Sequence, residues 1–79
     1  MKSDLKTIFQ DDEHWYFIKV DANGDYYLVT YSGGFAMETV VIKLSNEQVN
    51  DFMKENSSLL GLAQDLARNP ENYNLIKIP

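Results

Sequence analysis

The side chains that could carry acid–base chemistry are few, and the clearest candidate is His14. It is the only histidine among the 79 residues, and it sits between Glu13 and Trp15. A general base needs a second group to orient it and a pocket to tune it. Glu13 is adjacent in sequence, and adjacent residues on a strand point to opposite faces of a sheet. No G-x-S-x-G elbow, Walker glycine loop or H-E-x-x-H helix is present either. We therefore predict an exposed histidine, no catalytic residue and a protein that is not an enzyme.

The stretch Asp21-Ala22-Asn23-Gly24-Asp25 matches the opening of a calcium-binding loop, with oxygen ligands at alternate positions. An EF-hand loop also needs glycine at its sixth position and glutamate at its twelfth. Tyr26 and Ser32 occupy those positions here. The Asn23-Gly24 step is a strong hairpin signal, so a turn explains the stretch. We expect no metal and no other cofactor.

Composition narrows the classes of partner. The formal charge is −5, and the seven lysine and arginine residues are scattered along the chain. Because phosphate backbones attract proteins through such residues, nucleic acid is not expected as a partner. A basic protein surface is favoured, since opposite potentials steer association, although an acidic composition also serves solubility alone.

The chain also lacks the signals of secretion or membrane insertion. No apolar run approaches the roughly 18 residues of a membrane span, and the first residues do not resemble a signal peptide. With no cysteine there is no disulfide, as is usual in a reducing compartment. We expect a cytoplasmic protein that does not bind a membrane.

Strand patterns organise the first half of the chain. Aromatic and β-branched runs predict three consecutive antiparallel strands, at residues 15–20, 26–31 and 36–44. The turns between them lie at residues 21–25 and 32–34. Residues 1–10 fit either a short helical turn or an edge strand, since their apolar spacing suits both. Residues 74–78 alternate weakly and suggest a final edge strand.

Helical patterns follow the strands. Ser45-Asn46-Glu47-Gln48 is a capping box and predicts a helix that ends near Glu55. A second apolar stripe runs from Leu59 to Ala67, and Asn69-Pro70 stops it. We predict a single α+β domain over residues 1–79. It is an antiparallel β-meander of three to four strands, packed on one face by a C-terminal broken helix of two short helices.

A register centred on Asn23-Gly24 and Gly33-Gly34 predicts two sheet faces. The helix-covered face would carry Tyr16, Ile18, Val20, Tyr27, Val29, Tyr31, Ala36, Val40, Ile42 and Leu44. The second face would carry Trp15, Phe17, Lys19, Tyr26, Leu28, Thr30, Met37, Thr39, Val41 and Lys43. This second face is unusually apolar for a face left to water. Either residues 1–10 cover part of it, or another chain binds there.

Acidic and aromatic residues gather along the first predicted hairpin. The candidate partner-binding residues are Asp11, Asp12, Glu13, Trp15, Asp21, Asp25 and Tyr26. Tyrosine and tryptophan dominate interface hot spots, and the carboxylates suit a basic partner. The alternative is a structural or assembly role, as a homodimer through the second face or as a small subunit of a complex. A monomer and a weak homodimer both fit the sequence.

The order of these features resembles that of small bacterial α+β proteins, many of them uncharacterised, some of which are encoded beside polymorphic or contact-dependent toxins. The resemblance covers most of the chain. It rests on residues 15–20, Tyr26-Tyr27-Leu28, residues 33–38, residues 44–48, Leu62-Ala63, Leu66-Ala67 and residues 69–73. These are turn and packing positions, so the resemblance implies a shared fold. It also implies an immunity protein that inhibits a toxin by occluding its active site.

Overall fold

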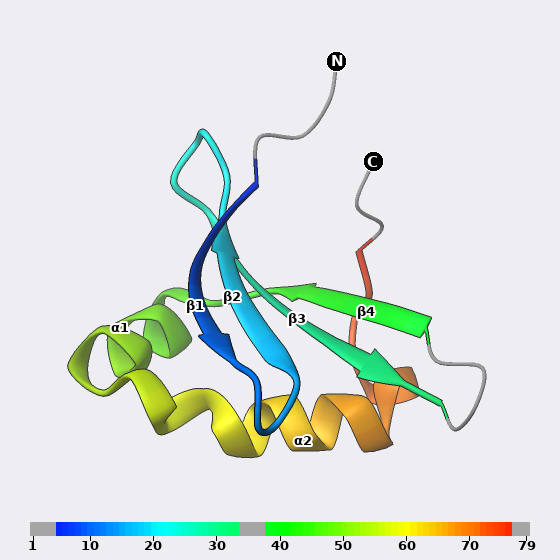
Figure 1. Cartoon of the computed structure of the whole chain (residues 1–79). Coiled ribbons are helices and arrows are strands. Elements are labelled where there is room, and N and C mark those ends of the chain that lie inside the picture. Colours follow the sequence, from blue (N-terminus) through cyan, green and yellow to red (C-terminus); the bar gives the residue numbers. More distant parts are fainter. Residues whose placement is uncertain (1–4, 34–37, 77–79) are drawn as a thin grey trace.

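The computed structural model describes residues 5–33 and 38–76, and within them the chain forms one antiparallel sheet with helices on one side (Figure 1). The sheet order is β1-β2-β3-β4, so each strand pairs with the next one along the chain. The strands are β1 (Lys6–Asp11), β2 (Tyr16–Val20), β3 (Tyr26–Ser32) and β4 (Glu38–Lys43). The predicted α+β meander is confirmed, with four strands.

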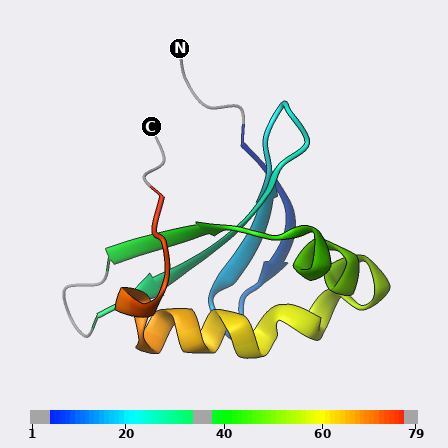
Figure 2. The ribbon, with the colours of Figure 1, turned by 180° about the vertical axis from the view of Figure 1, so that it is seen from behind.

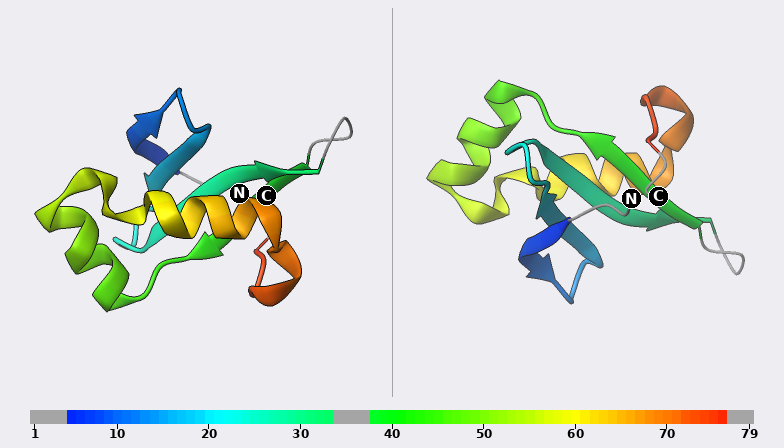
Figure 3. Two further views of the ribbon diagram at one scale, coloured as in Figure 1. Left: turned by 90° about the horizontal axis from the view of Figure 1, so that it is seen from below. Right: turned by 90° about the horizontal axis from the view of Figure 1, so that it is seen from above.

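Two helices follow the sheet, and both lie against the same face of it (Figures 2 and 3). They are α1 (Asn46–Lys54) and α2 (Leu60–Arg68), with short 3-10 turns η1 (Asn56–Leu59) and η2 (Pro70–Asn72). The predicted capping box is present at the start of α1. There, Ser45 accepts from the backbone N–H of Gln48, whose side chain accepts from the backbone N–H of Ser45. In the part of the chain that the structure describes, no helix is long and apolar enough to cross a membrane.

The hydrophobic core lies between the sheet and the two helices. Its buried members are Tyr16, Ile18, Leu28, Val40, Ile42, Leu44, Phe52, Leu59, Ala63 and Leu66. Phe9 of β1 joins them from the edge of the sheet, with its ring 5.8 Å from that of Tyr16 and 5.6 Å from that of Phe52. Burial of these apolar side chains is the main force that holds the helices to the sheet.

The predicted register of the first hairpin is wrong by one residue. Tyr16 pairs with Thr30, Ile18 with Leu28 and Val20 with Tyr26. The loop has three residues, Ala22 to Gly24, closed by a hydrogen bond from the Asp21 N–H to the Asp25 carbonyl. Gly24 has φ +88°, the left-handed conformation typical of a three-residue hairpin loop. A one-residue slip exchanges the faces of a strand.

Among the predicted sheet faces, only the assignment of the β3 side chains is wrong. Leu28 and Thr30 are buried on the helix side, and Tyr26 packs against the core from that side. Tyr27, Val29 and Tyr31 therefore lie on the opposite face. The faces of β2 and the described part of β4 are as predicted, because their burial patterns put Ile18, Val40 and Ile42 in the core.

The N-terminal segment is an edge strand, which settles the choice between helix and strand. Phe9 pairs with Ile18 and Thr7 with Lys19, so Ile8 is the extra residue of a bulge. β1 extends the sheet sideways, and its described residues do not fold over the second face as one of our alternatives proposed. The strand is held in the sheet by pairing and by the contacts of Phe9.

The second hairpin also differs from the prediction. Ser32 pairs with Glu38 and Tyr27 with Lys43. The predicted register, centred on Gly33-Gly34, would instead pair Tyr27 with Val40. Gly33 of the predicted turn centre is described. Gly34, Ala36 and Met37 lie outside the described residues. Farther along, the N–H of Ile76 donates to the Val41 carbonyl over 2.8 Å, so the C-terminal segment runs beside the outer edge of β4 (Figure 1). Residues 74–76 lie where the final strand was predicted, without regular strand structure.

Candidate functional site

The sheet face turned away from the helices is the candidate binding surface (Figure 3). We call it the open face. Its residues on β2, β3 and β4 are Phe17, Lys19, Tyr27, Val29, Tyr31, Thr39, Val41 and Lys43, and β1 adds Thr7 and Gln10, which pair with Lys19 and Phe17. At its centre, Val29 and Val41 are paired across β3 and β4 and are only 3% and 2% exposed. The larger side chains around this pair form the accessible surface of the open face.

Three rings form an aromatic row at one end of the open face. Tyr31 of β3 stands between Trp15 and Phe17, with ring centroids 6.3 Å from Trp15 and 6.2 Å from Phe17. Both contacts are edge-to-face, an arrangement that aromatic pairs prefer. The Lys19 Nζ lies 5.8 Å from the Phe17 centroid and donates to the Thr7 hydroxyl. The row is thus an ordered apolar surface with a cation at one end.

Trp15 is the most exposed member of this row, with 61% of its surface accessible. It has φ +59°, a left-handed conformation that is unusual for a bulky side chain. Its N–H donates to the Asp11 carbonyl over 2.8 Å, and its own carbonyl accepts from the Thr30 hydroxyl over 2.9 Å. The sequence pattern placed Trp15 in the strand, but β2 starts at Tyr16 and Trp15 belongs to the preceding turn.

The turn between β1 and β2 is built around the carboxylate of Asp11. This carboxylate accepts from the backbone N–H groups of Glu13 and His14 and from the His14 ring Nδ1, each at 3.0 Å. Desolvation raises the pKa of Asp11, but the hydrogen bonds from His14 outweigh that effect and the pKa is lowered. The Asp11 carboxylate therefore stabilises the turn. Asp12 and Glu13 are exposed and form no ion pair with any described residue.

The loop between β2 and β3 uses Asp21 in a similar way. Its carboxylate accepts from the N–H groups of Asn23 and Asp25 and from the Tyr27 hydroxyl, at 2.8 to 3.0 Å. The backbone bond from Asp25, followed by the bond from Tyr27, lowers the pKa of Asp21. The same hydroxyl bond raises the pKa of Tyr27. Asp25 lies 3.6 Å from the Lys43 ammonium in a surface ion pair.

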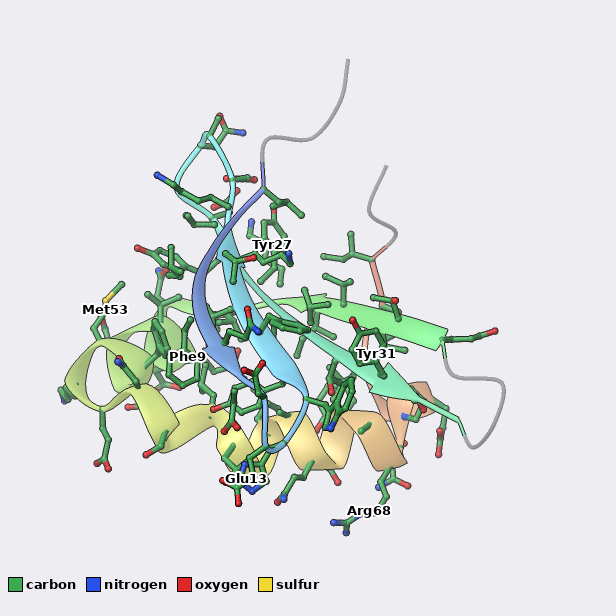
Figure 4. All side chains as sticks on the ribbon, in the orientation of Figure 1. Phe9, Glu13, Tyr27, Tyr31, Met53 and Arg68 are labelled. Atoms are coloured by element: carbon green, nitrogen blue, oxygen red, sulfur yellow. The ribbon has the colours of Figure 1, made fainter. Side chains whose placement is uncertain are left out.

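The seven sequence-predicted residues therefore fall into two groups. Asp11, Asp12, Glu13 and Trp15 lie at one end of β2, and Asp21, Asp25 and Tyr26 at the other. Figure 4 shows this separation through the labelled Glu13 and Tyr27. Five strand residues span about 16 Å, so the two groups are not one cluster.

Tyr26 is the residue that the register error misplaced. It packs on the helix side against the core, and Tyr27 takes its position on the open face. Tyr31 was assigned to the wrong face for the same reason. Phe17 was placed on the second face correctly but was not chosen as a site residue. In the correct register, strand alternation places the rings of Phe17, Tyr27 and Tyr31 together on the open face.

His14 is exposed, and Asp11 rather than Glu13 orients its ring. In the described part of the chain, no three histidine, cysteine or acidic side chains lie close enough to hold a metal ion. The absence of a catalytic role stays a prediction.

No protein-family model, curated protein or solved structure matches this chain. The geometry of the described residues is therefore what bears on function.

Proposed function

We propose that the chain is a non-catalytic protein-binding domain. Its contact surface is the aromatic row of Trp15, Tyr31 and Phe17 together with the exposed carboxylates of Asp12 and Glu13. In its finer form, the proposal is an immunity-type inhibitor that covers a basic functional surface of a toxin. The observation that carries the proposal is the exposed Trp15, held in a left-handed turn by hydrogen bonds at its N–H and its carbonyl.

The exposed tryptophan supports binding on energetic grounds. A strained backbone conformation costs of order 1–3 kcal/mol and persists only where the surroundings impose it. An exposed indole also leaves apolar surface in water. Burial of Trp15 against a partner would remove that surface, and the fixed turn would reduce the ordering cost of binding.

The charges beside the aromatic row point to a basic partner. Asp12 and Glu13 precede Trp15 on the same turn, and neither forms an ion pair with a described residue. The formal charge of −5 adds a long-range attraction for a basic surface. Affinity is then expected to fall as ionic strength rises.

Self-association through the open face is the competing proposal, and the charges disfavour it. Lys19 and Lys43 are the charged residues of this face, and stacking two copies would bring four ammonium groups into one interface. Lys43 has a surface partner in Asp25, whereas among the described residues Lys19 contacts the Thr7 hydroxyl and the Phe17 ring and forms no ion pair. Sedimentation over a range of concentrations distinguishes a dimer from a monomer.

The experiment is to co-express the tagged chain with the products of its neighbouring genes and to isolate the complex. A stoichiometric basic partner, lost with Trp15→Ala and weakened with Glu13→Lys, is the expected result. Met53→Ala is the control, because Met53 is 55% exposed on α1, away from the open face. Toxicity of the partner when expressed alone would support the inhibitor form. Recovery of the chain alone, or a complex indifferent to Trp15→Ala, would overturn the proposal.

A further inference from the structure

A groove on the helix side of the molecule borders the proposed contact surface at Tyr31, which lines both. It has a volume of about 320 Å³ and lies between the β1–β2 turn, the end of β3 and α2. The lining residues with polar side chains are His14, Thr30, Tyr31, Ser32, Gln64 and Arg68. This volume is at the lower end of the range for small-molecule sites.

Two of the three hydroxyl groups of the lining, those of Thr30 and Ser32, donate to backbone carbonyls and are not available as donors. Ser32 donates to the Ala67 carbonyl over 2.7 Å, and Thr30 donates to the Trp15 carbonyl over 2.9 Å. The remaining side-chain donors are the Arg68 guanidinium, the Gln64 amide, the Tyr31 hydroxyl and the His14 ring. The groove therefore offers cationic and amide N–H groups within an acidic protein.

Arg68 has no carboxylate partner within 4.0 Å among the described residues. Asp65 is the nearby acid, but its carboxylate accepts from the Tyr73 hydroxyl and from the Asn69 amide. Those two bonds lower the pKa of Asp65 more than the charge of Arg68 does. The five donors of the guanidinium are thus open to a ligand.

The His14 ring adds a further nitrogen donor from the turn between β1 and β2. Its Nδ1 faces the Asp11 carboxylate at 3.0 Å, so Nδ1 carries the proton when the ring is neutral. Nε2 then presents a lone pair, and only the imidazolium form offers an Nε2–H to an anion. The other titratable or charged groups around the ring are Asp12 and Glu13 of its own turn, Tyr31 of β3 and Arg68 of α2.

We infer that this groove binds a small oxyanion, a carboxylate or a phosphate, held by Arg68 and by the protonated ring of His14. Gln64 supplies a neutral donor from the preceding turn of α2. Arginine recognises both anions with a pair of parallel N–H groups. Arg68 and Gln64 take no part in the aromatic row, so failure of anion binding in the groove would leave the proposed function standing.

The test is a titration followed by NMR on the ¹⁵N-labelled chain, with citrate and with inorganic phosphate at constant ionic strength. The amide signals of residues 14, 32–33 and 64–68 report the groove. We expect saturable shifts there with at least one of the two anions, because the guanidinium supplies charge-assisted hydrogen bonds. The probe that binds more tightly identifies the preferred anion.

Three variants make the result specific. Arg68→Gln is expected to weaken binding about tenfold or more, as loss of a charged donor does. His14→Gln is expected to weaken binding through loss of the ring donor, while Lys54→Gln removes a cation from α1 and leaves binding unchanged. Shifts that do not saturate with either anion, or an Arg68→Gln chain that binds as tightly as Lys54→Gln, would overturn the inference.

Discussion

The hydroxyl of Thr30, in the middle of the sheet, donates a hydrogen bond of 2.9 Å to the backbone carbonyl of Trp15. Thr30 is 3% exposed and Trp15 is 61% exposed, so the bond joins the core to the most prominent surface ring. The turn conformation of Trp15 is thereby tied to the register of β2 and β3. The exposed indole is held in place by the same residues that stabilise the fold.

Thr30→Val tests this link, because valine keeps the shape of threonine and removes the hydroxyl. The Trp15 carbonyl would lose its partner, and the free energy of unfolding is expected to fall by about 1 kcal/mol. Trp15 is the only tryptophan, so its fluorescence anisotropy should fall as the turn loosens. Thr39→Val, at an exposed position of β4, is the control. Unchanged anisotropy and stability in Thr30→Val would show that the bond does not hold the turn.

Tyr16 carries a buried hydroxyl with no hydrogen-bond partner among the described residues. Burial, followed by the charge of Asp11, raises the pKa of this phenol. Tyr16→Phe should leave the free energy of unfolding unchanged or raise it by about 1 kcal/mol, because an unsatisfied polar group is removed. Urea unfolding measures this.

The comparison for Tyr16→Phe is Tyr73→Phe, which removes a hydroxyl that donates to Asp65 and should lower stability. A larger loss in Tyr16→Phe than in Tyr73→Phe would mean that the buried hydroxyl has a partner, such as a bound water.

Gly61 in α2 has open space around it, since no atom lies within 4 Å of the position that a Cβ would occupy. Gly61 therefore does not mark a close approach of α2 to the sheet. Gly61→Ala is expected to raise the free energy of unfolding by about 0.5–1 kcal/mol, through helix propensity. Gly24→Ala should do the opposite, because Gly24 has φ +88°. Thermal unfolding of both variants checks the pair, and a stabilised Gly24→Ala would contradict the loop geometry.

Acid sensitivity follows from the three carboxylates that organise turns and the C-terminal segment. Asp11, Asp21 and Asp65 all have pKa values lowered from 3.8. A lowered folded pKa contributes stability that is complete above the unfolded pKa and is lost as the pH falls through the folded one. Stability should therefore decline as the pH is lowered below about 4.

Asp21→Asn isolates one of these contributions. It should be less stable than the unmodified chain near neutral pH and show a shallower decline in acid, because position 21 no longer titrates. Chemical unfolding at a series of pH values measures the slope. Glu71→Gln, at an exposed position in η2, is the control. An Asp21→Asn chain with the original acid slope would contradict the assignment.

Local signals in the sequence were sufficient for the helices, because the capping box at Ser45 and the stop at Asn69-Pro70 act within a few residues. The strands were also recognisable from composition. The register was not, since Asn23-Gly24 suits both a two-residue turn and the three-residue loop that forms. The choice depends on tertiary packing, which buries Leu28 and leaves Tyr27 to bond Asp21.

The candidate site was predictable only in part. Trp15 was identified by residue type, but its left-handed turn has no sequence signal, because bulky residues seldom adopt that conformation. The bulge at Ile8 was equally hidden, since residues 5–9 fit a helical and a strand pattern alike. The acidic residues at positions 11–13 and those at positions 21 and 25 are close together in the sequence. In the structure, the extended strand β2 separates the two groups, which lie at its opposite ends.

The affinity of the isolated basic partner for the chain and for its Trp15→Ala variant is the most direct measurement of the central claim. Hot-spot truncation costs about 2 kcal/mol or more, so we expect a loss of at least about thirtyfold. Met53→Ala should stay within about threefold, as peripheral surface substitutions do. Equal affinity of the unmodified chain and Trp15→Ala, with both folded, would contradict the assignment of the aromatic row as the contact surface.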